Sequence, residues 1–142
     1  MIYTHLTKQA MRLAFNVHKD QTDKSGIPYI YHPIHLAEQM DDENTVIVAL
    51  LHDVVEDNNM TFKDITQMGF PDEVIVALKL LTHDDTVEYM DYIKSLSKNE
   101  IARKVKLADL RHNSDLTRLS TVNENDIQRV IKYKEAILVL SN

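Results

Sequence analysis

A group of polar residues that could bind a metal ion lies at the end of the most apolar stretch of the chain. Residues 46–55 are mostly aliphatic, yet four polar side chains occur within and just after them: His52, Asp53, Glu56 and Asp57. On a helix, His52 and Glu56 would lie one turn apart, as would Asp53 and Asp57. Burying such charges without partners is costly. A divalent metal against this corner would offset that cost, and a solvated helix end is the alternative.

A histidine and an aspartate elsewhere in the chain could complete such a metal site. His32 stands at the expected start of a helix, after a loop that contains Gly26 and Pro28. Asp109 ends the mostly apolar stretch 105–109, which is expected to be helical. Imidazole and carboxylate ligands without a thiolate suit Mn²⁺ or Fe²⁺ better than a closed structural zinc site. Such an ion can polarise a phosphoryl oxygen and lower the pKa of a bound water.

Three segments resemble the successive motifs of HD-type phosphohydrolases. They read KSGIPYIYHP from residue 24, ALLHDVVEDNNMTFKDI from residue 49 and VKLADLRHN from residue 105. In this order they are similar to the hydrolase domain of RelA/SpoT-type proteins and to its small stand-alone relatives of the metazoan SpoT homologue type. The similarity extends from about residue 10 to about residue 118.

The resemblance implies an all-helical HD fold and a complete catalytic site. In that family a Mn²⁺ ion would be bound by four ligands, which match His32, His52, Asp53 and Asp109 here. Glu56 and Asp57 would then orient or deprotonate the attacking water. The implied reaction removes pyrophosphate from the 3′ position of guanosine tetra- or pentaphosphate.

Other residues of the same motifs are candidates for contact with a substrate. Lys24 and Ser25 match the nucleotide-binding loop of the family, and Tyr29 follows closely, although a tyrosine there could instead pack in the core. Lys106 precedes the last expected ligand and could contact a phosphate or remain solvated. Asn113 lies one helical turn after that ligand, so both can face one cavity.

Two features limit what the resemblance implies. Many long family members have an arginine before the loop lysine, where it stacks on guanine, whereas this chain has Asp23. A carboxylate cannot supply that cation–π contact. The remaining histidines of the motifs and helices are interpreted as surface or hydrogen-bonded core residues rather than ligands: His18, His35, His83 and His112.

The composition favours one all-α domain over residues 1–142. Only two glycines and three prolines occur, too few for a protein rich in turns and strands. Apolar periodicity and capping residues predict a bundle of about eight helices. Their expected ranges are 3–19, 33–40, 45–57, 62–68, 72–82, 86–97, 99–118 and 124–140.

Charge and residue usage narrow the classes of partner. The net charge is −6 and no basic stripe occurs, which argues against nucleic acid as a partner. The longest apolar run, residues 46–51, is too short to span a bilayer. The first twenty residues lack the pattern of a signal peptide, and the absence of cysteine fits a cytoplasmic protein. The sequence does not indicate an oligomeric state.

Three functions fit these observations. The leading one is a Mn²⁺-dependent hydrolase of guanosine 3′,5′-bis(diphosphate) (ppGpp). The first alternative is another HD nucleotide phosphatase, which would act on a nucleoside monophosphate or on NADPH. The second is a non-catalytic HD module that binds a metal and a nucleotide as a sensor. The presence of both Glu56 and Asp57 favours an enzyme, because binding alone would not need them.

Overall fold

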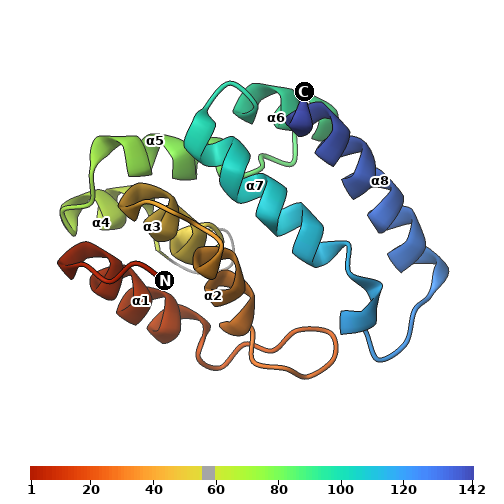
Figure 1. The fold of residues 1–142 in the computed structure, drawn as a ribbon, viewed down its shortest axis with the longest axis horizontal. Helices are drawn as coiled ribbons and strands as arrows, with labels where there is room; N and C mark the ends of the chain where they lie inside the picture. The colour runs from red at the N-terminus through yellow and green to blue at the C-terminus, as the bar shows by residue number, and fades with distance from the viewer. Residues whose placement is uncertain (56–59) are drawn as a thin grey trace.

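The computed structural model describes residues 1–55 and 60–142, and its regular elements are helices (Figure 1). Within these ranges the extended structure is limited to an isolated bridge between Thr22 and Pro28. The described part of the chain forms the α-helices α1 (His5–His18), α2 (Tyr31–Glu38), α3 (Glu43–Leu51), α4 (Phe62–Gln67), α5 (Asp72–Leu81), α6 (Tyr89–Leu96), α7 (Glu100–Asn113) and α8 (Glu124–Ser141). A short 3₁₀ turn, η1 (Leu116–Arg118), follows α7. The predicted all-α bundle is confirmed.

Helix α3 forms the centre of the bundle. Every residue from Thr45 to Leu51 is buried, and α3 packs against α1, α2, α5 and α7. The Asp42 side chain caps the helix by accepting a hydrogen bond from the Thr45 backbone N–H at 2.8 Å. A helix that is apolar on all faces must be covered by other elements on all faces. The surrounding helices supply that cover, and the candidate site lies at the C-terminal end of α3.

The predicted extent of this helix was wrong, because α3 ends at Leu51 rather than near residue 57. His52 is the C-cap, and the chain turns through residues 52–55. The imidazole Nδ1 of His52 bonds the carbonyl of Ala49 at 2.7 Å, and the Val54 N–H bonds the carbonyl of Leu51 at 3.0 Å. Both bonds satisfy carbonyls that a helix end leaves without partners. Glu56 and Asp57 lie outside the described residues.

Helix α7 also ends earlier than expected, at Asn113 instead of residue 118. Ser114 caps it, and Asp115 accepts a hydrogen bond from the Thr117 N–H at 3.0 Å, which closes the 3₁₀ turn η1. An aspartate that bonds the backbone two residues on favours a turn over a continued helix. Figure 1 shows α7 beside α8, with η1 and the loop after it joining them.

The loop between α1 and α2 is held by its own aspartate. The Asp23 carboxylate accepts hydrogen bonds from the Ser25 N–H at 2.8 Å and the Ile27 N–H at 3.0 Å. Gly26 lies between them with a φ of 80°, a conformation that residues with a Cβ rarely adopt. The side chain of Ser25 then donates to the carbonyl of Arg118 at 2.9 Å. The loop is thereby tied to the segment that follows α7.

Candidate metal centre and substrate cleft

Three of the four predicted ligands converge from separate elements. His32 lies in the first turn of α2, His52 caps α3, and Asp109 lies in α7. All three are buried, and one ligand atom of each lies within 4.8 Å of the others. His32 Nε2 is 2.9 Å and His52 Nε2 is 3.6 Å from Oδ1 of Asp109. Residues far apart in sequence thus present two nitrogens and an oxygen to one point.

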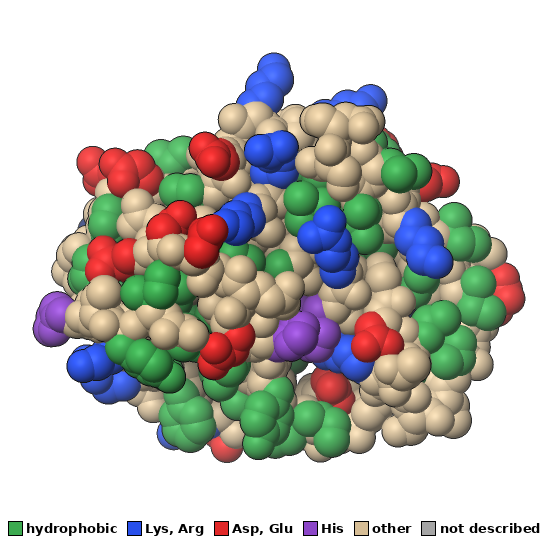
Figure 2. Space-filling view, in the orientation of Figure 1, with side chains coloured by type: hydrophobic (Ala, Val, Ile, Leu, Met, Phe, Trp, Pro, Cys, Tyr) green, Lys and Arg blue, Asp and Glu red, His purple; other side chains and the backbone are tan. Residues whose placement is uncertain are grey.

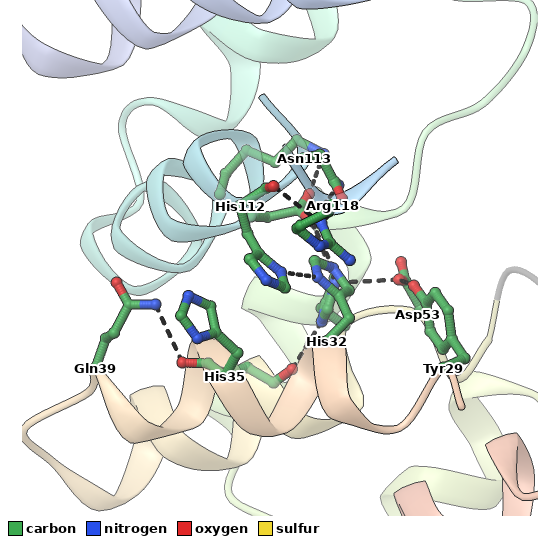
Figure 3. Close-up of polar contacts among 12 residues, drawn as sticks. Tyr29, His32, His35, Gln39, Asp53, His112, Asn113 and Arg118 are labelled. Atoms are coloured by element: carbon green, nitrogen blue, oxygen red, sulfur yellow. Dashed lines mark hydrogen bonds and ion pairs between the residues drawn. The ribbon is translucent and has the colours of Figure 1, made fainter. Parts of the chain in front are cut away.

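The fourth predicted ligand, Asp53, joins this group through His52. Its Oδ2 lies 3.1 Å from His52 Nε2, and the same oxygen accepts a hydrogen bond from the Tyr29 hydroxyl. Figure 3 shows Tyr29 and Asp53 side by side at the edge of the group. The structure therefore brings three of the candidate ligands to one point and places Asp53 beside His52, where the turn after α3, not a continued helix, positions it.

The chemistry of these donors fits a cation. His52 Nδ1 faces a carbonyl, which only accepts, so Nδ1 carries a proton and Nε2 is the nitrogen that faces the centre of the group. That Nε2 is buried and forms no hydrogen bond with the described residues, yet it lies close to the carboxylates of Asp53 and Asp109. A lone pair aimed at two carboxylates is unfavourable unless a proton or a metal ion lies between them.

The pKa values reflect the same demand for positive charge. Burial opposes protonation of His52, but the carboxylates of Asp53 and Asp109 outweigh it and raise its pKa well above the ordinary value. Burial also opposes ionisation of Asp53, yet His52 lowers the pKa of that carboxyl to about 2. The pKa of His32 is lowered, mainly by burial. The site therefore favours ionised acids around one central cation.

Two predicted substrate contacts, Lys106 and Asn113, also lie against the candidate ligand Asp109. Lys106 Nζ donates to Oδ2 at 2.9 Å, and Asn113 Nδ2 donates to Oδ1 at 3.0 Å. Although burial opposes the charge, Lys106 and the histidines hold the pKa of Asp109 well below its ordinary value. Second contacts of this kind orient a metal ligand.

Two adjoining cavities lie beside the ligands. The substrate cavity has a volume of about 380 Å³ and is bordered by Lys24, Ser25 and Tyr29 of the first loop and by Arg129 of α8. The inner cavity has a volume of about 240 Å³ and is lined by Asp53, His83, Tyr89, Tyr92, Lys106 and Asp109. Asn113 and Tyr133 line both cavities. The predicted loop residues thus border one cavity, and two of the candidate ligands, Asp53 and Asp109, border its neighbour.

A third cavity, the outer cavity, lies on the other side of His32 and has a volume of about 480 Å³. It is lined by Asp23, Tyr31, His35, Glu38, His112 and Arg118, among others. In Figure 2, histidine side chains reach the surface near the middle of the displayed face, among acidic, basic and apolar side chains. In Figure 3, His112 lies between His35 and His32.

Comparison with known proteins identifies the family. The sequence matches the HD domain family over residues 10–113. This chain belongs to the HD domain family. The bifunctional (p)ppGpp synthase/hydrolase SpoT of Escherichia coli K12 is 35% identical over an alignment of 123 residues, which covers 75% of this chain and 17% of that protein. This chain therefore spans about one sixth of that relative.

A relative of similar size and a solved structure extend the comparison. A guanosine-3′,5′-bis(diphosphate) 3′-pyrophosphohydrolase of Xenopus tropicalis is 32% identical, with 90% of this chain and 78% of that protein aligned. The structure of a metazoan SpoT orthologue superposes with a TM-score of 0.80 at 24% identity, and covers 99% of this chain and 88% of the other. The predicted recognition of an HD domain of the RelA/SpoT type is confirmed.

Sequence reasoning missed several residues of this HD domain that border the site. His112 contacts a ligand, and Arg129 and Tyr133 of α8 line the substrate cavity. His112 follows Asp109 by three residues on α7, so helical spacing could have placed both on one face. Arg129 and Tyr133 are four residues apart and share a face of α8 in the same way.

Among the described residues, no helix combines the length and apolar character required to cross a membrane.

Proposed function

We propose that this HD domain is a Mn²⁺-dependent hydrolase that removes pyrophosphate from the 3′ position of ppGpp. One observation carries the metal part of this proposal: the buried Nε2 of His52 faces the carboxylates of Asp53 and Asp109, an arrangement that requires a cation or a proton between them. His32 supplies a second nitrogen to the same point. The mixed nitrogen and oxygen donors favour Mn²⁺ or Fe²⁺.

The names of the relatives support the choice of substrate. The Escherichia coli protein is named a (p)ppGpp synthase/hydrolase, and the Xenopus tropicalis protein is named a 3′-pyrophosphohydrolase of guanosine-3′,5′-bis(diphosphate). The latter aligns with this chain over most of both proteins. A small-molecule nucleotide substrate in the cytoplasm follows from this proposal.

Each part of the cleft then has a task. When bound, a divalent ion supplies Lewis-acid activation of a phosphoryl oxygen and of water. Tyr29 keeps Asp53 turned toward the centre, and Asn113 and Lys106 do the same for Asp109. Lys24 borders the substrate cavity with 62% of its side chain exposed, where it can meet an incoming phosphate.

Two neighbouring cations of the substrate cavity, Lys24 and Arg129, suit an anion of this kind. Arg129 Nη1 lies 3.0 Å from the carboxylate of Asp126, and Lys24 Nζ lies 3.6 Å from the same oxygen. Both cations border the cavity, and Tyr133 adds an aromatic wall beside them. A nucleotide with two diphosphate groups can place one diphosphate beside these cations and the other at the metal centre. Glu56 and Asp57, outside the described residues, are proposed to orient or deprotonate the water.

The test is a substrate panel assayed with Mn²⁺. We expect ppGpp to be converted with release of pyrophosphate, chelation to abolish the reaction and added Mn²⁺ to restore it. NADPH and nucleoside monophosphates serve as comparison substrates with phosphate as the detected product. Metal-dependent turnover of these compounds without action on ppGpp would replace the proposed substrate. Binding of ppGpp without turnover of any compound would indicate a sensor module instead. Parallel assays with Fe²⁺ identify the preferred metal.

A further inference from the structure

The candidate ligands of this HD domain each have a second contact that fixes their orientation. In three of these contacts the acceptor is an oxygen that can only accept. A backbone carbonyl accepts from His52, and the carboxylates of Asp53 and Asp109 accept from Tyr29 and Asn113. The contact of His32 is different. Its Nδ1 lies 2.7 Å from Nδ1 of His112, so two imidazole nitrogens share one hydrogen bond.

The geometry of this contact is that of an in-plane hydrogen bond. The planes of the His32 and His112 rings differ by 3°, and their centroids are 5.0 Å apart although the two nitrogens are 2.7 Å apart. Rings stacked face to face could not be so far apart with nitrogens so close. The two rings therefore lie edge to edge in nearly one plane, and the lone pair of one nitrogen points at the N–H of the other.

The proton in this bond must change sides when a metal binds. His32 Nε2 lies 2.9 Å from Oδ1 of Asp109, and a carboxylate only accepts, so in the metal-free site Nε2 carries the proton and Nδ1 accepts from His112. A metal ligand needs the lone pair of Nε2. The proton of His32 then resides on Nδ1, and Nδ1 of His112 must accept the hydrogen bond from it. A neutral imidazole can take either role, because its own proton can sit on either nitrogen.

We infer that His112 is a positioning residue that orients His32 in both the metal-free and the metal-bound site, and thereby raises the affinity of the centre for a divalent cation. The inference rests on the proposed metal site, but not on the identity of the substrate. An outer partner of a ligating histidine typically contributes about tenfold to hundredfold in metal affinity.

The surroundings of His112 are suited to this role. Arg118 Nη1 donates to the backbone carbonyl of His112 at 2.9 Å and to Oδ1 of Asn113 at 3.2 Å, which fixes the end of α7. The ring of His35 stacks on the ring of His112, with centroids 4.0 Å apart. Figure 3 shows His112 pointing from α7 to His32 on α2, with His35 beside it. The backbone and one ring face are thus held while the nitrogen edge faces His32.

The experiment measures the dissociation constant of Mn²⁺ for the wild-type protein and three variants. His112→Phe keeps a flat ring against His35 but removes both nitrogens, and we expect Mn²⁺ affinity to fall about tenfold to hundredfold. His112→Asn places an amide near the position of Nδ1, where rotation of the amide offers either an acceptor or a donor. We expect this variant to retain most of the affinity.

The matched control is His35→Phe, which keeps an aromatic ring stacked on His112 and removes a histidine from the same cavity without changing the bond to His32. We expect its Mn²⁺ affinity to equal that of the wild type. The melting temperature of each metal-free variant separates a positioning role from a structural one, because a structural role would lower stability in the absence of Mn²⁺. If His112→Phe does not fold, the comparison of His112→Asn with His112→Ala, and the ring ¹⁵N shifts of His32 in the metal-free wild type, replace it.

The outcomes are separable from those of the substrate assay. Unchanged Mn²⁺ affinity in His112→Phe, or an equal loss in His112→Asn, would overturn the inference. An equal loss in His35→Phe would also overturn it, because the cavity rather than the hydrogen bond would then matter. A wild type that binds no Mn²⁺ would overturn the proposed metal site and this inference together. The affinities are measured with the metal alone, so they decide the inference whether or not ppGpp is hydrolysed.

Discussion

Nε2 of His52 and Oδ2 of Asp53 lie 3.1 Å apart at the end of α3, although the two residues are adjacent in sequence. On a continued helix their side chains would project about 100° apart. The chain instead turns after Leu51, and the turn aims both side chains at one point. The end of a buried helix therefore supplies two of the four candidate ligands, and the other two come from α2 and α7.

Loss of one ligand should remove metal and activity together. We expect His52→Ala and Asp109→Asn to contain little Mn²⁺ after dialysis and to hydrolyse ppGpp far more slowly than the wild type. Added Mn²⁺ should raise the melting temperature of the wild type, since binding at about 100 times the dissociation constant stabilises by about 2.7 kcal/mol, and should not raise that of the variants. Asp41→Asn is the control, because Asp41 pairs with Lys104 at an exposed site. A variant with full metal content would remove that residue from the ligand set.

Removal of one hydroxyl from the loop should weaken the metal centre. Tyr29→Phe deletes the donor to Oδ2 of Asp53 and retains the ring, which packs beside His18 and His32. We expect the Mn²⁺ dissociation constant to rise by about tenfold or more, as for other outer partners of ligands. Tyr31→Phe is the matched control, because Tyr31 lies in the same segment with 61% of its surface exposed. Equal affinity in Tyr29→Phe and the wild type would show that Asp53 does not need this hydroxyl.

The two cations of the substrate cavity should affect KM more than kcat. We expect Lys24→Gln and Arg129→Gln each to raise KM for ppGpp, because both border the cavity and neither contacts a candidate ligand. Binding that is equal in the ground state and the transition state changes KM alone. Lys134→Gln, on the exposed part of α8, is the control. Steady-state kinetics at saturating Mn²⁺ tests this, and an unchanged KM in both variants would place the substrate phosphates elsewhere.

The charge state of His112 should contribute to the pH dependence of stability. Burial and the nearby Arg118 lower the pKa of His112 to about 4, below its ordinary value of 6.5. The folded form therefore binds fewer protons than the unfolded form between these values. The stabilisation from this group is complete above pH 6.5 and is lost as the pH falls toward about 4.

We expect the free energy of unfolding of the metal-free protein to decrease across this window in urea titrations. Arg118→Gln should raise the pKa of His112 in an NMR titration and make the decrease shallower. A His112 resonance that titrates near 6.5 in the wild type would contradict the predicted environment.

The sequence identifies the ligands better than it identifies what surrounds them. His32, His52, Asp53 and Asp109 stood out because polar residues in apolar stretches need compensation, and the motif order supported the choice. The helices were predictable from apolar periodicity and caps. The end of α3 could not be predicted in this way. It is accompanied by a bond from the His52 side chain to the Ala49 carbonyl, and a histidine at that position is equally compatible with a continued helix.

The second contacts could not be read from the sequence for a different reason. His112 bonds a residue 80 positions earlier, and Ser25 bonds a carbonyl 93 positions later, so both depend on how α2, α7 and the first loop pack. Lys106 has the charge of a phosphate ligand, but the fold places its amine against Asp109. Residue type alone does not distinguish these roles; the tertiary partner does.

The last prediction concerns Glu56 and Asp57, which follow the ligands His52 and Asp53 in the sequence. Carboxylates there are expected to accept a proton from the attacking water or hold it in line with phosphorus, which is typically worth about 10²- to 10⁴-fold in rate. Glu56→Gln and Asp57→Asn keep size and hydrogen bonding while removing the charge. We therefore expect kcat to fall about a hundredfold or more while the Mn²⁺ content is nearly unchanged.

Comparison with Asp53→Asn distinguishes this role from metal binding, because loss of a ligand should lower metal content and kcat together. Metal analysis and kcat are measured on the same preparations of all three variants. Rates within about threefold of the wild type in both Glu56→Gln and Asp57→Asn would assign these acids to the protein surface rather than to the reaction. Loss of metal from Glu56→Gln would make Glu56 a fifth ligand, and the division between ligands and catalytic acids would then be wrong.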